Sequence, residues 1–332
     1  MVKDKYNVLG IGNAIVDIIS VVDKSFLVDN NLVPGSMKLV DQKETKKIQS
    51  KLKIKKMQAG GSVANSIAGI SILKGKCAFI GKKSDDFLGN SFSESMNNLG
   101  VTLSDYSLKK NSNLSTASCV VLVTDDGQRT MCTHLGVSVN LEVHDIAEDL
   151  IERSSIIYLE GYLFDLPSAK KSFIKAAKLA KKYNKKVALS LSDSFCVDRH
   201  RDSFKDFIKN NVDILFANED EIKSLYEKED LLSCSKEIYE NIRMAIITKG
   251  KDGASGFFEN KRIDVDSIIT NVVDTTGAGD LFAAGFLNYY CQGFSLEKSM
   301  KAGVICATEI IKDYGARPNN NLINILIKNN LN

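Results

Sequence analysis

The sequence of 332 residues contains no tryptophan, three prolines and three histidines. Because the histidines are few and spread over the chain, a histidine-based metal centre is not expected. With so few prolines there is no proline-rich linker that would separate two domains. No apolar run is long enough to cross a bilayer, and the polar start of the chain leads directly into a strand, without a secretory signal. We therefore expect a cytoplasmic protein that is not attached to a membrane.

The cysteines and the net charge exclude further classes of protein. The seven cysteines are odd in number, and none is spaced as a CxxC pair or a zinc finger, which favours reduced thiols in a cytosol. The net charge of +3 is too small to indicate a nucleic-acid partner. The length and the apolar content of 44% are typical of a soluble globular protein, either one large domain or a domain with an accessory piece.

The segment Asp274–Asp280 reads Asp-Thr-Thr-Gly-Ala-Gly-Asp and lies between a strand-like apolar run over 268–273 and a helix-like apolar run over 281–287. The first N–H groups of a helix have no partner within it, and together with the helix dipole they attract an anion. Small side chains let that anion approach the backbone closely. Asp280, beside this predicted anion hole, could take a proton from an attacking hydroxyl. An ordinary helix cap after a glycine turn is the alternative.

Strands and helices alternate regularly from about residue 140 to residue 248, which predicts a mostly parallel sheet covered by helices on both faces. The segments 118–124 and 128–134 are strand-like and are joined through Asp125-Asp126-Gly127, which predicts a hairpin. With part of 18–40, this hairpin predicts a small antiparallel sheet that stands off the main body. A second hairpin is predicted over 253–265.

Two common nucleotide-binding motifs are excluded. Gly10 and Gly12 follow the first predicted strand, but Ile15 stands where the dinucleotide fingerprint needs a third glycine. The acidic residue expected about twenty residues later is also missing. No Gly-Lys pair is followed by serine or threonine, so a Walker-type phosphate loop is absent from the sequence.

Two separated motifs, Gly60-Gly61-Ser62-x-x-Asn65-Ser66 and Asp274–Asp280, follow an Asn13-x-x-x-Asp17 segment. In order and spacing, over nearly the whole chain, they resemble the PfkB family of sugar and nucleoside kinases. The resemblance implies a single ribokinase-like α/β domain over 1–332, with a central, mostly parallel sheet sandwiched by helices. It also implies a small β-sheet lid, formed by roughly 18–40 and 102–135. ATP, Mg²⁺ and phosphoryl transfer to an alcohol are implied as well, with K⁺ as a cofactor of some relatives.

The resemblance assigns the catalytic step to the late motif. Asp280 would be the base that assists the acceptor hydroxyl as it attacks the γ-phosphorus. Gly277, Ala278 and Gly279, with the N–H of Asp280, would stabilise the charge on the transferred phosphoryl group.

The early motifs would bind the sugar. Asn13 and Asp17 come just after the first predicted strand, where an α/β sheet presents its binding crevice. A carboxylate accepts two hydroxyl groups at once, which suits a ribose diol, although a loop aspartate that caps a turn has the same pattern. Gly60 and Gly61 would let the backbone approach the same sugar, and Asn65 would hydrogen-bond to it. A tight turn before a helix is compatible with both interpretations.

Four further elements resemble the parts of the family that bind nucleotide and cations. Asn218-x-x-Glu221 matches the element that organises Mg²⁺ through water, although Asn-Glu-Asp-Glu is also a good helix start. Thr248 and Gly250 end a strand and resemble the nucleotide loop. Asp274 and Thr276 resemble a monovalent-cation site. Arg129, after the hairpin turn, resembles a lid arginine that swings toward the phosphates, and a solvated hairpin arginine is an equal alternative.

Within the family the chain is most similar to the adenosine kinases. Ile15, Cys119 and Leu135 fall where those enzymes place an apolar slot for the purine, although apolar lid residues are also what a small core needs. Two residues depart from that pattern. Glu160 replaces a small residue and resembles a sugar-binding glutamate of ribokinases, and His200 stands where an aromatic wall is expected.

The resulting hypothesis is an adenosine kinase, which converts adenosine to AMP. Alternatives are a ribose or fructose kinase, an inosine or guanosine kinase, and a non-catalytic nucleoside sensor on the same scaffold. Either a monomer or a homodimer formed through the lid is compatible with the sequence.

Overall fold

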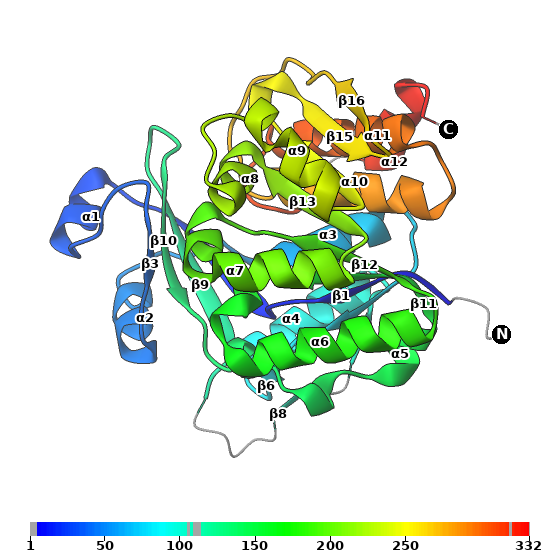
Figure 1. Ribbon diagram of the computed structural model, residues 1–332. Coiled ribbons are helices and arrows are strands. Elements are labelled where there is room, and N and C mark those ends of the chain that lie inside the picture. Colours follow the sequence, from blue (N-terminus) through cyan, green and yellow to red (C-terminus); the bar gives the residue numbers. More distant parts are fainter. Residues whose placement is uncertain (1–4, 105–106, 109–113, 319–320, 332) are drawn as a thin grey trace.

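The computed structural model describes residues 5–104, 107–108, 114–318 and 321–331. Its larger sheet has nine strands in the order β16-β15-β14-β13-β12-β11-β1-β5-β7 (Figure 1). The seven strands from β14 to β7 pair in parallel, and β15 and β16 add an antiparallel edge. The predicted mostly parallel sheet is therefore confirmed, as is the second hairpin. The strands of this sheet are β1 (Tyr6–Ile11), β5 (Cys77–Ile80), β7 (Thr102–Leu103), β11 (Ser154–Glu160), β12 (Lys186–Ser190), β13 (Ile214–Asn218), β14 (Met244–Thr248), β15 (Ala254–Phe258) and β16 (Lys261–Val265).

Helices cover both faces of this sheet, because alternate side chains of a strand point to opposite sides. Val8 of β1 belongs to one apolar cluster and Leu9 to the other. The first cluster is covered by α3 (Ser62–Ile72), α4 (Phe87–Asn98), α10 (Ala278–Cys291), α11 (Leu296–Ile310) and α12 (Leu322–Lys328). The second is covered by α5 (Glu148–Glu152), α6 (Pro167–Lys182), α7 (Ser194–Asn211), α8 (Glu219–Tyr226) and α9 (Leu231–Asn241). The predicted ribokinase-like α/β architecture is thus confirmed.

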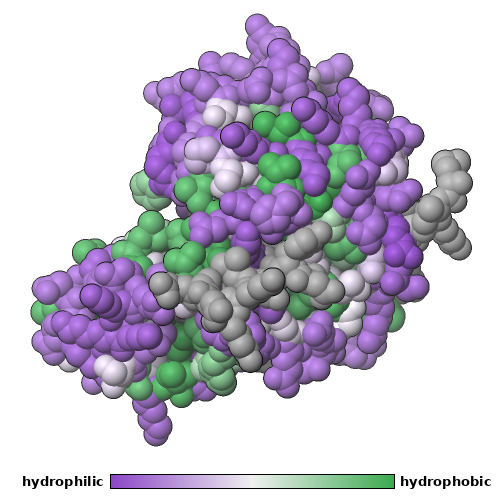
Figure 2. Space-filling view, turned by 90° about the horizontal axis from the view of Figure 1, so that it is seen from below, coloured by the Kyte–Doolittle hydropathy of each residue, from purple (hydrophilic) through white to green (hydrophobic). Residues whose placement is uncertain are grey.

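A smaller sheet stands to one side of the main body, with the order β3-β10-β9-β2-β4 (Figure 1). Its outer face packs against α1 (Lys24–Asp29) and α2 (Gln42–Gln49) through a cluster that includes Leu27 and Ile48. Figure 2 shows apolar surface where this smaller lobe meets the main body. The strands of the smaller sheet are β2 (Ile15–Val21), β3 (Met37–Leu39), β4 (Lys56–Gly60), β9 (Ala117–Val123) and β10 (Arg129–His134).

The predicted hairpin is confirmed as β9 and β10, but the predicted lid differs in three ways. Lys56–Gly60 adds a strand, Thr102–Leu103 belongs to the larger sheet, and the pairs β2–β9 and β10–β3 are parallel rather than antiparallel. The glycine pair at 60–61 looked like part of a turn, which hid the short strand before it. Residues 105–106 and 109–113 of the predicted lid lie outside the described residues.

The strand predicted over 268–273 is wrong. Residues 266–273 have no regular structure, and Ile269 is 99% exposed. The larger sheet ends at β16, so this apolar run pairs with none of its strands. The N–H groups of Val273 and Asp274 instead bond to the carbonyl of Ile311, which follows α11. The late motif is therefore entered from a loop.

Within the described part of the chain, every helix is too short or too polar to cross a membrane. None of the seven cysteines, all of which lie in the described residues, forms a disulfide, and six of them are buried.

Candidate active site

The two motifs meet at Asp280, in the first turn of α10. Its Oδ1 accepts a hydrogen bond from the Ser62 hydroxyl at 2.7 Å, and its Oδ2 accepts one from the Asn65 amide at 2.9 Å. The Ser66 hydroxyl donates to the Asp280 carbonyl at 2.9 Å. Helix α3, which begins directly after the glycine pair, thus fixes a carboxylate more than two hundred residues further along the chain. Sequence reasoning placed Ser62 in the motif but gave it no role.

Burial raises the pKa of Asp280 to about 6, while the Ser62 and Asn65 hydrogen bonds and the nearby Arg317 guanidinium oppose that rise. A carboxylate with this pKa is ionised at neutral pH and is more basic than an exposed aspartate. Both properties suit a general base.

The start of α10 leaves backbone donors free. Gly277 caps the helix in the left-handed region, with φ 75°. The Ala278 N–H is already bonded to the Thr275 carbonyl at 3.2 Å. The N–H groups of Gly279 and Asp280, by contrast, have no acceptor among the described residues. Gly279 is exposed, with open space around it. An anion can therefore approach the N–H groups of Gly279 and Asp280, whereas the N–H of Ala278 is already bonded within the turn.

Asp17 lies on β2, not in the loop that was expected. In the small sheet it stands beside Cys119 of β9. Gly60 packs so closely against the Asp17 carboxyl group that a Cβ at this position would collide with it. Burial raises the pKa of Asp17 to about 7, the Arg317 guanidinium lowers it, and the charge of Asp280 adds to the rise. The two aspartates are thus electrostatic neighbours, as expected if they act on one substrate.

Glu160 ends β11 and is fully enclosed, with 1% exposure. One oxygen accepts the Asn13 side-chain amide at 2.5 Å, and the other accepts the backbone N–H groups of Asn13 at 3.3 Å and Val63 at 3.0 Å. Burial raises the pKa of Glu160 to about 7, against these hydrogen bonds. Glu160 therefore joins the end of β1 to the start of α3. Three protein donors occupy the carboxylate that resembled a sugar ligand.

Two buried amide oxygens in the same region have no hydrogen-bond partner, namely Oδ1 of Asn13 and Oδ1 of Asn65. In the orientation observed, each NH₂ group donates to a carboxyl group, so the two Oδ1 atoms are the acceptors that are left free. A buried acceptor without a partner costs roughly 1–3 kcal/mol, which a ligand donor would recover.

Arg129 of β10 pairs with Asp274 rather than with solvent. Its Nε lies 2.9 Å from Asp274 Oδ1, and its Nη2 donates to the Thr275 hydroxyl at 3.2 Å. The same Oδ1 accepts the N–H and the hydroxyl of Thr276, and Oδ2 accepts the Gly315 N–H. The predicted monovalent-cation ligands are thus already paired, and a guanidinium supplies the positive charge. In this arrangement Asp274 and Thr276 do not fit K⁺.

Asn218 and Glu221 form a reciprocal capping box at the start of α8. Both Glu221 oxygens accept from Asn218, at 2.8 and 2.9 Å. Burial raises the pKa of Glu221 to about 7, and Asp193 and Asp280 contribute to the rise. The described residues contain no group of three metal ligands. A water bound to Mg²⁺ could still donate to Glu221, so the pair fits an outer-sphere role and not direct ligation.

The predicted nucleotide loop lies at the end of β14. The Thr248 hydroxyl donates to the Ala217 carbonyl at 3.4 Å, and Gly250 has open space around it.

The inner face of the small sheet carries an apolar cluster with Ile15 and Cys119, both nearly buried. Burial raises the pKa of the Cys119 thiol to about 12. Leu135 follows β10 and is half-buried, outside this cluster. Two of the three predicted slot residues are therefore brought together beside Asp17.

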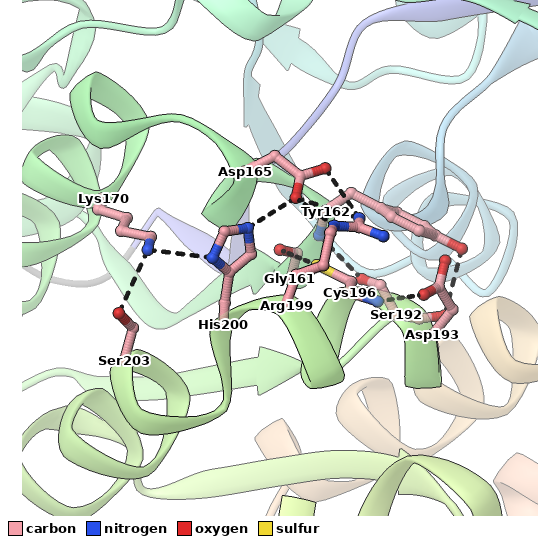
Figure 3. A network of polar contacts seen from close by, with 10 residues as sticks. All are labelled: Gly161, Tyr162, Asp165, Lys170, Ser192, Asp193, Cys196, Arg199, His200 and Ser203. Atoms are coloured by element: carbon pink, nitrogen blue, oxygen red, sulfur yellow. Dashed lines mark hydrogen bonds and ion pairs between the residues drawn. The ribbon is translucent and has the colours of Figure 1, made fainter. Parts of the chain in front are cut away.

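His200 does not form an aromatic wall. It sits at a kink in α7, with φ −130°, where its Nε2 lies 2.7 Å from Asp165 and its Nδ1 lies 3.4 Å from Lys170 (Figure 3). Another ring, missed in the sequence, lies nearer the carboxylates. Tyr162 donates to the Ser192 carbonyl at 3.2 Å. Burial raises its pKa, and the charges of several neighbouring carboxylates, Asp280 among them, add to the rise.

Arg317 was also missed, because no motif marks it. It follows α11, and its guanidinium bonds to the carbonyls of Ala59 and Ala64. The only local signal is the glycine two residues earlier, Gly315, which has φ 89°.

Comparison with known proteins places this geometry among kinases. The family model described as pfkB family carbohydrate kinase matches residues 28–322. The structure of an adenosine kinase from Sinorhizobium meliloti is 38% identical, covers 98% of this chain and 99% of its own, and superimposes with a TM-score of 0.90. A probable sugar kinase from Rhizobium etli is 37% identical over 99% and 100% of the chains, with a TM-score of 0.92. The probable fructokinase-6 of Arabidopsis thaliana is 28% identical over 79% of this chain and 72% of its own.

Proposed function

The chain belongs to the pfkB family of carbohydrate kinases, and on that premise we propose that it phosphorylates the primary alcohol of a ribonucleoside, with adenosine, converted to AMP, as the first candidate. Phosphotransferase activity with ATP follows from the family; the nucleoside is the proposed part. The observation that carries the proposal is the contact of Ser62 and Asn65 with Asp280, which puts the acceptor motif and the base in one site.

Asp280 would accept the proton of the attacking hydroxyl. Each of its oxygens accepts one protein hydrogen bond, and a carboxylate oxygen has a second lone pair for the substrate. The two donors come from successive turns of α3, so they hold the carboxylate in one orientation. Such positioning supplies much of the rate enhancement in phosphoryl transfer.

The free N–H groups of Gly279 and Asp280, at the positive end of α10, would stabilise the charge that develops on the transferred phosphoryl group. Mg²⁺ bound with the phosphates would neutralise part of their charge, and Glu221 would hold one of its waters. Arg129 is tethered to the same loop by Asp274, which leaves its guanidinium beside the anion hole.

The acceptor side of the site offers oxygen atoms. Asp17 and the free Oδ1 atoms of Asn13 and Asn65 all accept hydrogen bonds. A ribose, which presents several hydroxyl donors, fits such a set. The apolar strip of Ile15 and Cys119 beside Asp17 would suit a flat base attached to that ribose. The 38% identity to an adenosine kinase supports the same choice.

A free sugar is the second candidate, supported by the similarity to a probable sugar kinase and a probable fructokinase. Glu160 does not add to this case, because its side chain is only 1% exposed and holds Asn13 and Val63. The seven cysteines, which form no disulfide with one another, support a cytoplasmic location as a further part of the proposal.

The test is ADP formation from ATP and Mg²⁺ with a panel of adenosine, inosine, guanosine, ribose and fructose. We expect the highest kcat/KM with adenosine. Turnover of a free sugar at a higher kcat/KM than any nucleoside would refute the proposed substrate class. Binding of a nucleoside without ADP formation would indicate a sensor.

A further inference from the structure

Arg317 brings a positive charge into the region of the two aspartates. Its Nε and Nη2 both donate to the Ala59 carbonyl, at 3.2 and 3.0 Å, and its Nη1 donates to the Ala64 carbonyl at 3.4 Å. Nη2 also lies 3.6 Å from Met96 Sδ. Three donor atoms of the fork are therefore used to hold the guanidinium in place.

The two carbonyls bracket the acceptor site. Ala59 precedes Gly60, the residue on which the Asp17 carboxyl group rests. Ala64 precedes Asn65, which donates to Asp280. The guanidinium thus lies between the strand that supports Asp17 and the helix that orients Asp280.

The backbone around Arg317 is also fixed to the late motif. The N–H of Gly315 donates to Asp274 Oδ2 at 2.8 Å. Ala316 is fully buried and packs against the Cα of Gly277, where a Cβ would come within 2.7 Å. Movement of the loop 274–279 would therefore displace Arg317.

Arg317 is half-buried, and a cation that loses part of its solvent needs a compensating partner, because desolvation opposes the charged form. Burial lowers the pKa of Arg317 to about 10, and the charges of Asp17 and Asp280 oppose that fall. The group is therefore still a cation at neutral pH. The carbonyls satisfy its donors, and the two carboxylates supply the opposite charge.

We propose that Arg317 is a positioning residue of the phosphotransfer site, which fixes β4 against α3 and holds a positive charge beside Asp17 and Asp280. This inference rests on the proposed function, since it gives both aspartates their roles in the reaction. Arg317 itself need not touch the substrate.

Other groups also influence the pKa values of Asp17 and Asp280, and the acidic ones oppose the effect of Arg317. Ser62 and Asn65 donate to Asp280 from α3. The thiol of Cys119 faces Asp17 from β9. The acidic groups within electrostatic reach of Asp280 are Asp17, Tyr158, Glu160, Tyr162 and Glu221. All of these would be negative when ionised, whereas Arg317 is the cation that acts on Asp280.

The test compares two variants at the same position. Arg317→Gln removes the charge but keeps a donor for the carbonyls. Arg317→Lys keeps the charge but loses the planar fork that donates to both carbonyls. The pH dependence of kcat/KM is measured with the best alcohol of the panel, and thermal unfolding reports folding. Arg243→Gln, whose side chain is 78% exposed, controls for the loss of an arginine elsewhere.

Loss of a nearby opposite charge raises the pKa of a carboxylate. For Arg317→Gln we expect the acid limb of kcat/KM to move up by about one pH unit, which is about a tenfold loss of kcat/KM on that limb. For Arg317→Lys the limb should stay where it is in the wild type, even if the variant is less stable. A merely structural role would lower stability in both variants and move neither limb.

The proposal is overturned if the acid limb of kcat/KM does not move in folded Arg317→Gln. It is also overturned if that limb moves by a full pH unit in Arg317→Lys. The lysine variant alone decides the question if the glutamine variant does not fold. A wild type that forms no ADP with any alcohol refutes the proposed function instead. In that case ¹³C NMR titration of the aspartate carboxyl groups, which needs no substrate, still shows whether removing the charge raises their pKa values.

Discussion

Replacing Glu160 with glutamine is expected to stabilise the protein, relative to the wild type, more at pH 8 than at pH 5. Burial raises the pKa of Glu160 from 4.5 to about 7. Folding therefore favours its protonated form. The stability that this contributes is complete below pH 4.5 and is lost as the pH rises through about 7. At about 1.4 kcal/mol per unit, the loss in the wild type amounts to at most about 3.5 kcal/mol.

Glutamine keeps an acceptor for the two backbone N–H groups that bond to Glu160. The backbone N–H groups of Asn13 and Val63 cannot turn, so the glutamine Oε1 must face them, and its Nε2 then faces the Asn13 side chain. That amide can flip and accept. By contrast, Glu160→Ala would leave three buried donors without an acceptor. At roughly 1–3 kcal/mol each, this is a large part of the stability of a typical domain.

Urea unfolding followed by circular dichroism between pH 5 and pH 8 measures the effect. By the linkage relation, the difference in unfolding free energy between Glu160→Gln and wild type should grow by roughly 1–3 kcal/mol over this range. Glu240→Gln, at a side chain that is 59% exposed, is the matched control. Parallel pH curves for the wild type and Glu160→Gln would refute the reasoning.

Three other predictions concern the motifs and the hairpin. Gly60→Ala drives a methyl group into the Asp17 carboxyl, so KM should rise about tenfold or more while the melting temperature changes little, as checked by kinetics and calorimetry. Arg129→Met leaves Asp274 without its cation and should lower kcat more than it raises KM; an unchanged kcat would assign the arginine to structure alone. Gly277→Ala imposes a side chain at φ 75° and should cost about 1–3 kcal/mol in urea unfolding.

The sequence was sufficient for the main body because the information is local. Alternating strands and helices, and the glycine turn of the β9–β10 hairpin, each follow from patterns within a few residues. The residues of the two motifs could also be named from the sequence, because their order and spacing resemble those of the PfkB family. That Ser62 and Asn65 would be the donors to Asp280 could not be read from either motif alone.

The features that the sequence did not predict depend on contacts between residues far apart in the chain. The run 268–273 has the apolar composition of a strand, but strand formation needs a neighbour, and the sheet ends at β16. Glu160 resembled a sugar ligand because carboxylates serve both functions, and only the positions of Asn13 and Val63 distinguish them. Arg317 lies far from both motifs in the chain, and its importance arises from contacts that no periodicity encodes.

The most direct test of the account is to compare wild type and Asp280→Asn for ADP formation and for nucleoside binding. Asparagine can still accept from Ser62 but cannot take a proton, so turnover with adenosine should fall by about 10²–10⁴-fold while the nucleoside Kd changes little. An Asp280→Asn variant with wild-type turnover would contradict the assignment of Asp280 as the base on which the whole site is built.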